Sequence, residues 1–266
     1  MEIIGYIASI FIGILLGLIG GGGSILTVPV LVYFLGVDVL SATAYSLFIV
    51  GFTSVIGSVK YFKNELVSVK TAIIFGIPSI ITVYLTRSII IPNIPEHIFS
   101  IGSFDFTKNI VLMLLFAVLM IVASISMIKK SKELKEDDAE GKQKFNYPVI
   151  ILEGTAVGML TGLVGAGGGF LIIPALVVLS KLPIKKAIGT SLVIISAKSL
   201  IGFMGEKNLA SLDWNLLIIV TSLSVAGIFV GFILSKRIEG EKLKPIFGWF
   251  VLVMGIAILI KELYGV

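Results

Sequence analysis

The chain has 266 residues, of which 57% are hydrophobic and 14% are charged, and its mean hydropathy is +1.10. A soluble domain of this size cannot bury so much apolar surface, so the composition excludes a soluble globular protein and predicts that lipid surrounds most of the chain. Cysteine is absent and His97 is the single histidine, which excludes disulfides and predicts no metal and no cofactor.

The formal charge is +5, which in a soluble protein would raise the question of nucleic acid. The basic residues lie between apolar runs and form no cluster on a soluble face, so we expect no nucleic-acid partner. Residues 1–5 lack a basic segment and lead into a run that ends at a glycine loop. We therefore expect the first apolar run to belong to the mature protein and not to a cleaved signal peptide.

Ten apolar runs follow one another along the chain, five in each half. They cover residues 3–19, 24–36, 41–59, 69–86, 109–128, 148–164, 170–180, 187–205, 214–235 and 244–263. A helix needs roughly 20 residues to cross the hydrocarbon core. The first two runs of each half are shorter than that, so each short pair is predicted to form a hairpin bent at a glycine loop. Each of the other runs is predicted to span the membrane.

The two halves are related in sequence. At a constant offset of 145 residues, GLIGGGGSILTVPVLV aligns with GLVGAGGGFLIIPALV, and the register continues to Gly57 and Gly202. In this aligned stretch 16 of 41 paired positions are identical, including glycines, serines and the pair Pro29 and Pro174. Duplication of one unit explains such matches. We predict residues 1–128 to form an N-terminal membrane repeat and residues 148–266 a C-terminal membrane repeat.

The segment between the halves is strongly polar. Residues 129–144 read KKSKELKEDDAEGKQK, and their mixed charges without large apolar side chains predict a solvated linker over 129–147. We interpret this linker as cytoplasmic, and a role in binding a partner is the alternative.

The positions of the 21 Lys and Arg residues predict the orientation in the membrane. Stepping from span to span places the loops 60–70, 181–186 and 236–244 on the same side as the linker, and these four loops hold 16 basic residues. Four lie on the opposite side, namely Arg87, Lys108, Lys207 and Lys261. The positive-inside rule then predicts a multi-pass protein of the cell (inner or plasma) membrane with both termini outside.

A hairpin plus three spans crosses the membrane an odd number of times, so the second half must enter from the other face. The predicted fold class is therefore an all-α polytopic membrane protein. It consists of two inverted repeats, each a glycine-loop broken-helix hairpin plus three transmembrane helices. Transporters of this design bind substrate near the midplane, where the repeats meet and helices are interrupted.

Two glycine loops, at 20–23 and 165–169, carry the main functional prediction. Unwound backbone inside a membrane is tolerated only where protein or water satisfies its polar groups. Helices restarting at Ser24 and Phe170 would point their positive ends at the loops, which favours an anion. The alternative is that the glycines only allow close helix packing. The substrate-binding candidates in the loops are Gly20, Gly21, Gly22, Gly23, Ser24, Gly165, Gly167, Gly168 and Gly169.

Lys198 lies near the centre of the run 187–205, where an ammonium group costs a few kcal/mol unless it is paired or faces water. We expect it to contact the substrate or a counter-ion. The alternatives are a lysine that snorkels to the interface or one that neutralises Glu153. Ser46, Thr190 and Ser191 complete the candidate site because they match across the repeat, although membrane hydroxyls often bond their own backbone.

Catalysis is not predicted, because the sequence shows no paired embedded carboxylates, no nucleophile beside a base and no nucleotide-binding loop. The two glycine motifs, AIGTSL at 187–192 and the charged linker together resemble the sulfite exporter TauE/SafE family, also called the sulfonate permease group of membrane transporters. The resemblance covers essentially the whole chain. In that family's second half a neutral amide often stands around the position of Lys198, so a lysine here is a departure that alters the charge balance.

This resemblance implies a secondary transporter of small sulfur-containing anions such as sulfite, sulfoacetate or related organosulfonates. We expect alternating access of the two halves, with export the favoured direction. A passive anion channel and an accessory membrane subunit are the alternatives. The expected partners are the small anionic substrate and the lipid bilayer, while a coupling ion (proton or sodium) and an oligomeric state stay open.

Overall fold

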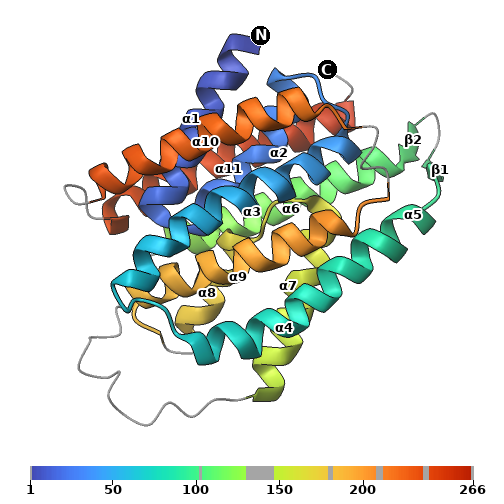
Figure 1. Ribbon diagram of the computed structural model, residues 1–266. Helices are drawn as coiled ribbons and strands as arrows, with labels where there is room; N and C mark the ends of the chain where they lie inside the picture. Colours follow the sequence, from blue (N-terminus) through green and yellow to red (C-terminus); the bar gives the residue numbers. More distant parts are fainter. Residues whose placement is uncertain are drawn as a thin grey trace.

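The computed structural model describes residues 2–101, 104–129, 147–178, 182–207, 212–235 and 240–264. Helices account for most of the described chain (Figure 1). This architecture confirms the prediction of an all-α polytopic membrane protein. Of the predicted linker at 129–147, only the two end residues are described, and the remainder lies outside the described residues.

Each half begins with a helix that leads into a glycine loop, followed by a second arm and three long helices. The first half contains α1 (Glu2–Ile19), η1 (Gly21–Leu26), α2 (Thr27–Pro29), η2 (Val30–Phe34), α3 (Val39–Lys63), α4 (Val69–Leu85), η3 (Thr86–Ile90), α5 (Ile91–Asn93) and α6 (Lys108–Ile128). The second half contains α7 (Tyr147–Val164), α8 (Gly169–Val178), α9 (Ile184–Met204), α10 (Trp214–Leu234) and α11 (Gly240–Tyr264).

The second arm of the first half folds back along α1. A Cβ atom built on Gly5 would lie 2.5 Å from Cδ2 of Leu35, and one built on Gly23 would lie 2.8 Å from the backbone nitrogen of Leu16. The arm therefore returns from the glycine loop to the level at which α1 began. In the second half, Ile150 of α7 and Leu176 of α8 belong to one buried apolar cluster, which also fits a returning arm.

Polar side chains cap helices at their ends. The Asp38 carboxylate accepts hydrogen bonds from the backbone N–H groups of Leu40 (2.9 Å) and Ser41 (3.2 Å) before α3. Asp213 caps α10 in the same way, and the two caps satisfy donors that a helix leaves unpaired at its start. Both aspartates stand where the chain is about to enter an apolar run.

The helices of the two halves pack on each other in an exchanged pattern (Figure 1). Helix α1 packs along α10, and its counterpart α7 packs along α4. The counterparts α3 and α9 pack on each other, as do α6 and α11. Each of these four pairs joins a helix of one half to a helix of the other, so the two halves share one core.

Individual contacts repeat across the halves at the same sequence offset. A Cβ atom on Gly57 would lie 2.8 Å from Ile228 and 3.5 Å from Leu192. One on Gly202 would lie 2.9 Å from Val83 and 3.5 Å from Leu47, and each of these residues stands 145 positions from its counterpart. Since Gly57 of α3 faces the first half of α9 and Gly202 of α9 faces the first half of α3, the two helices run antiparallel.

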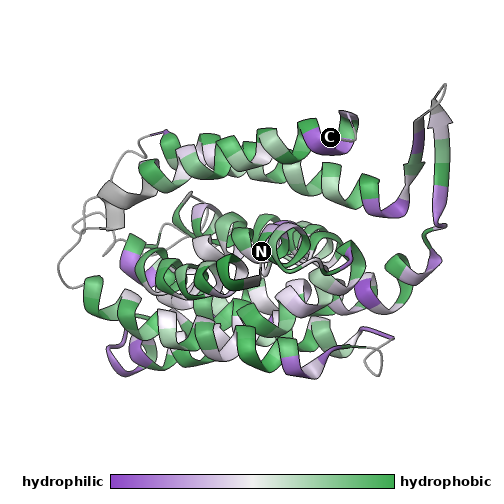
Figure 2. Cartoon of the chain, turned by 90° about the horizontal axis from the view of Figure 1, so that it is seen from above, coloured by the Kyte–Doolittle hydropathy of each residue, from purple (hydrophilic) through white to green (hydrophobic). Residues whose placement is uncertain are grey.

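The outer surface is apolar over the middle of the helices. Figure 2 shows hydrophilic residues toward the two ends of the helices and hydrophobic residues between them. Among the described residues, seven helices are long and apolar enough to cross a membrane. Helix α7, which we predicted as a short hairpin arm, is one of them with 18 residues. Large apolar side chains such as Ile3, Leu152 and Tyr264 are more than two-thirds exposed, as lipid contact requires.

One segment departs from the all-α prediction. The loop after α5 forms an antiparallel pair of strands, β1 (His97–Ile101) and β2 (Phe104–Thr107). The Ser100 hydroxyl donates to the Asp105 carboxylate at 2.6 Å, and His97 lies 3.5 Å from the same carboxylate. Hydrogen bonds from Ser100 and His97 lower the pKa of Asp105 from its ordinary value. This exposed cluster pins the two strands together.

Small residues set the helix distances, and one of them offers a direct test of the packing. A Cβ atom on Gly158 of α7 would lie 2.5 Å from the backbone oxygen of Ser79 in α4, whereas one on Gly76 would meet only Ile194 at 3.8 Å. We expect Gly158→Ala to destabilise the protein by about 1–3 kcal/mol, since the helices must move apart. The matched Gly76→Ala should leave the melting temperature in detergent unchanged or slightly higher. Equal melting temperatures for the two variants would contradict this packing.

Candidate functional site

The two glycine loops meet inside the protein. A Cβ atom on Gly21 would lie 3.0 Å from the carbonyl carbon of Gly169, and one on Gly169 would collide with the backbone of Gly21. The backbones of η1 and α8 therefore touch, and only glycine fits on either side. Gly167 lies against Ser24 of η1, where its Cβ position is 3.4 Å from the Ser24 Cβ. The two loops thus share one region of the core.

The loops differ in conformation. In the first loop only Gly20 has a positive φ, 75°, and helix resumes at Gly21. In the second loop Gly165, Gly167 and Gly168 have φ values of 72°, 62° and 75°, and helix resumes at Gly169. The predicted restart at Ser24 is wrong by three residues, and that at Phe170 by one. The left-handed glycines turn the chain without the side-chain clash that other residues would suffer.

Lys198 projects from α9 into the second loop. Its side chain is fully buried, and its ammonium nitrogen donates a hydrogen bond to Oγ1 of Thr161 at 2.8 Å. Thr161 donates its own proton to the backbone oxygen of Val157 at 2.7 Å, which leaves its oxygen free to accept. A Cβ atom on Gly168 would lie 2.7 Å from the Lys198 nitrogen. The absence of a side chain at Gly168 is what makes room for the ammonium group.

No carboxylate neutralises this ammonium group within the part of the chain that the structure describes. The ion pairs found there join Arg87 to Glu206, His97 to Asp105 and Lys108 to Glu96. Glu153, which we considered as a partner of Lys198, makes no such pair with it. An ammonium group has three donors, and the hydrogen bond to Thr161 uses one of them. The remaining donors and the charge are therefore available to a ligand.

Gly22 and Gly23 lie against α1, and the other five predicted residues lie in two outer groups. Gly20 lies against Ile188, whose backbone oxygen accepts a hydrogen bond from Ser191 at 2.8 Å. Thr190 accepts a hydrogen bond from the backbone nitrogen of Ser68 at 2.9 Å, which ties it to the connection between α3 and α4.

At the equivalent place in the other half, Gly165 lies against Thr43, one turn before Ser46. The Ser46 hydroxyl is buried and has no hydrogen-bond partner among the described residues. The structure therefore gathers Gly21, Ser24, Gly167, Gly168, Gly169 and Lys198 in one region. It places Ser46, Thr190 and Ser191 near the first residue of each loop, away from the point where the loops meet.

Sequence reasoning missed one polar residue of this region. Thr161 holds the Lys198 ammonium group, yet it looked like an ordinary hydroxyl in an apolar run. The signal that could have found it is its place four residues before Gly165, where one helical turn brings it back under the loop. Ser54 and Ser199 are repeat mates with buried hydroxyls that have no partner in the described part of the chain.

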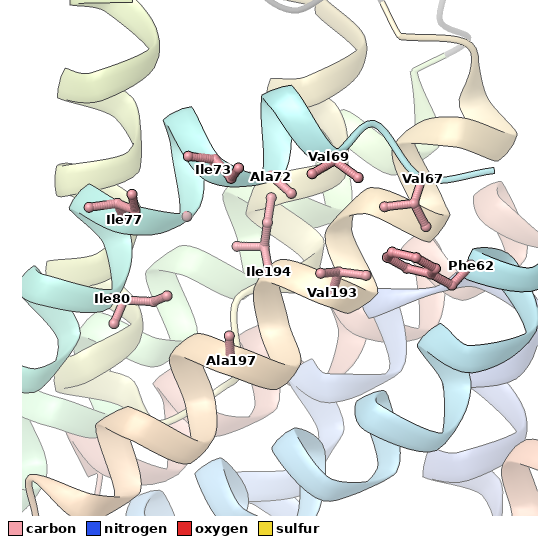
Figure 3. Close-up of a pocket in the computed structure, with 11 residues that line it drawn as sticks. Phe62, Val67, Val69, Ala72, Ile73, Ile77, Ile80, Val193, Ile194 and Ala197 are labelled. Carbon is pink, nitrogen blue, oxygen red and sulfur yellow. The ribbon is translucent and has the colours of Figure 1, made fainter. Parts of the chain in front are cut away.

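A separate cavity lies between α4 and α9 (Figure 3). Its volume is about 220 Å³, and its lining is entirely apolar, including Phe62, Ile73, Ile77 and Ile194. Such a cavity has no donor for an anion. It is either a space for a lipid acyl chain or a packing defect. It is not the site that the glycine loops form.

Comparisons with known proteins decide the family. The family model described as "Sulfite exporter TauE/SafE" matches residues 6–258. The chain belongs to the sulfite exporter TauE/SafE family. This assignment confirms the resemblance seen in the glycine motifs, and it makes the protein a membrane transporter, not an enzyme.

Relatives of this TauE/SafE chain occur in bacteria and archaea. A "Probable membrane transporter protein" of Xylella fastidiosa (strain 9a5c) is 27% identical over 261 residues, which cover 93% of this chain and 91% of that protein. The "Probable membrane transporter protein YunE" of Bacillus subtilis (strain 168) is 29% identical over 79% of this chain and 81% of its own length. The "Probable membrane transporter protein MJ0441" of Methanocaldococcus jannaschii is 33% identical over 40% of this chain and 42% of its own length. No solved structure matches the TauE/SafE chain.

Proposed function

We propose that this TauE/SafE protein is a secondary transporter of small sulfur-containing anions such as sulfite, sulfoacetate or related organosulfonates. The observation that carries the proposal is the Lys198 ammonium group, fully buried beside Gly168 with no carboxylate partner in the described chain. A buried charge is costly unless it is compensated. An anionic substrate would compensate it during each transport cycle.

The surrounding backbone adds to this preference for negative charge. The N–H groups of Gly169 and Phe170 begin α8 without a backbone acceptor among the described residues, whereas those of Leu171 and Ile172 donate to the Gly168 oxygen at 3.0 Å. The helix dipole places partial positive charge at this end of α8. Because Gly168 lacks a side chain, the Lys198 ammonium group lies close to these donors. A sulfite or sulfonate group offers several oxygens, which can accept from Lys198 and from the backbone at once.

The arrangement of the halves supports alternating access. We infer that the two repeats are inverted, because the counterparts α3 and α9 run antiparallel and the contacts of Gly57 and Gly202 are exchanged between halves. The glycine loops then enter from opposite membrane faces and meet between α3 and α9. Rocking of one repeat against the other would expose this meeting point to each side in turn. The proposed orientation has both termini outside the cell membrane and export as the favoured direction.

The substrate class can be tested by direct binding. Purified protein in lipid nanodiscs should bind at least one of sulfite, sulfate, thiosulfate, sulfoacetate and taurine, measured by calorimetry. Choline and glucose serve as a cationic and a neutral control. Binding of choline or glucose without binding of any sulfur compound would overturn the assignment of an anion substrate.

The transport mechanism needs a flux measurement. In proteoliposomes with an imposed proton or sodium gradient, we expect the bound anion to accumulate above its equilibrium level. Flux that never exceeds equilibrium under either gradient would favour a passive anion channel. Absence of flux despite specific binding would favour an accessory subunit.

A further inference from the structure

A second buried cation lies away from the glycine loops. Arg87 belongs to η3, the segment that continues α4, and its side chain is fully buried. Its Nη1 atom lies 3.3 Å from Oε2 of Glu206, whose side chain is 11% exposed. Glu206 follows the last residue of α9 by two positions. The pair therefore lies at the end of the helix that carries Lys198.

The ion pair leaves one edge of the guanidinium group unused. The Nε and Nη2 atoms of Arg87 are buried and have no hydrogen-bond partner among the described residues. In a planar guanidinium group, these two N–H bonds point the same way along one side. Two parallel donors match two oxygens bonded to a single atom, as in a carboxylate, sulfite or sulfonate. Burying such donors without a partner is unfavourable, so an oxyanion that accepts from both would be favoured at this edge.

The repeat gives this position a counterpart at the other end of the protein. A Cβ atom on Gly205 would lie 3.0 Å from the Cβ of Arg87. The residues 145 positions away from these two are Lys60 and Phe232, and they also meet, with the Lys60 ammonium 4.3 Å from the Phe232 ring centre. The two halves thus carry a cation at equivalent positions, one at each end of the protein. Arg87 belongs to η3 and Lys60 to α3.

We propose that Arg87 forms a second binding site for a small oxyanion at the end of α9, separate from the site at Lys198. Lys198 and Gly205, the residue that Arg87 contacts, are seven residues apart, or about 10 Å along the helix axis, so the two sites lie at different levels of α9. The Nε and Nη2 donors hold two oxygens of the anion, while Glu206 holds the guanidinium group by Nη1. This site does not depend on the transporter assignment, because the two parallel donors of Arg87 are enough to select an oxyanion.

The proposal is tested by counting anions on the full chain. Purified protein in nanodiscs is titrated with [³⁵S]sulfite, and the parent protein should bind two per chain. The double variant Arg87→Gln, Glu206→Gln preserves local neutrality and should bind one, with the affinity of the remaining site unchanged. Lys198→Met should also bind one. Excess chloride, a spherical anion, should displace sulfite from the Arg87 site poorly, because it cannot engage two parallel donors equally well.

Two single variants separate charge from geometry. Arg87→Lys keeps the charge but not the paired donors, so its sulfite affinity at this site should fall roughly 10- to 100-fold. Glu206→Gln keeps an acceptor for Nη1 but removes the negative charge beside Arg87, so sulfite should bind there at least as tightly as in the parent protein. Size-exclusion profiles check that each variant is folded.

The possible outcomes separate this site from the transporter proposal. If the parent protein binds one sulfite, and Lys198→Met alone removes it, the Arg87 site does not exist while the transporter proposal stands. If the double variant still binds two with unchanged affinity, the inference is likewise overturned. If Arg87→Lys weakens one site and Lys198→Met weakens none, the second site stands and the role proposed for Lys198 fails.

Discussion

Replacing Lys198 with methionine is expected to abolish anion transport and to make the folded protein more stable. Methionine fills a similar volume but removes the charge that the proposed substrate would neutralise. Hydrogen bonds to charged groups contribute about 1.5–3 kcal/mol each, so sulfite binding at this site should weaken roughly 10- to 100-fold. The stability should rise, since a buried ammonium group without a counter-ion is unfavourable in the empty protein.

The opposite signs of these two effects make the test specific. If Lys198 only supported the fold, its replacement would make the protein less stable, because Thr161 would lose its hydrogen-bond partner. Melting temperature in detergent and [³⁵S]sulfite binding are therefore measured on the same preparation. The matched control is Lys63→Ala at the exposed end of α3, which should change neither quantity. A variant at Lys198 that melts lower and binds sulfite as well as the parent protein would show a structural lysine.

Thr161→Val separates the ammonium group from its support. The substitution retains the side-chain volume but removes the oxygen that accepts from Lys198 at 2.8 Å. Since the charge remains, we expect sulfite affinity to fall less than in Lys198→Met, by about 10-fold or less. Sulfite titration of the two variants side by side ranks the two effects. A larger loss for Thr161→Val would mean that the threonine, and not the lysine, contacts the anion.

Hydropathy and the internal repeat were sufficient to predict the helical fold. Lipid requires every spanning backbone to satisfy its own polar groups, so runs of about 20 apolar residues leave helix as the main choice. The same reasoning could not locate the helix restart at Gly21. There the chain forms a tight helical turn directly after Gly20, because the next arm packs against α1, and that contact is not encoded in local composition.

The sequence pointed to those site residues whose placement inside a membrane is energetically costly. It gave no signal for the others. Lys198 was found because a charge in an apolar run needs a reason, and the glycine loops were found because they break helices. Thr161 gave no such signal, since hydroxyls are common in membrane helices.

Arg87 was assigned to an outer loop because the apolar run ended at residue 86. In the structure, helix continues through η3 and α5 to Asn93, and Arg87 lies buried against Gly205 and Glu206.

Alanine at Gly21 or Gly169 is expected to impair both folding and transport, because each glycine occupies the space that the other's Cβ atom would need. Gly169 does not adopt a positive φ, so the loss would come from contact and not from backbone strain. Each single variant should lose about 1–3 kcal/mol of stability and at least 10-fold in sulfite flux. Gly76→Ala, with open space around its Cβ position, is the matched control and should transport normally.

The double variant Gly21→Ala, Gly169→Ala decides whether the loops act on each other. Once one alanine has separated η1 from α8, the second alanine meets less resistance, so the two losses should sum to more than the loss of the double variant. A double-mutant cycle on the free energy of unfolding should give a coupling of about 0.5–3 kcal/mol. If the two losses of unfolding free energy were strictly additive, the two glycines would act independently. A shared pocket at their contact would then have no support.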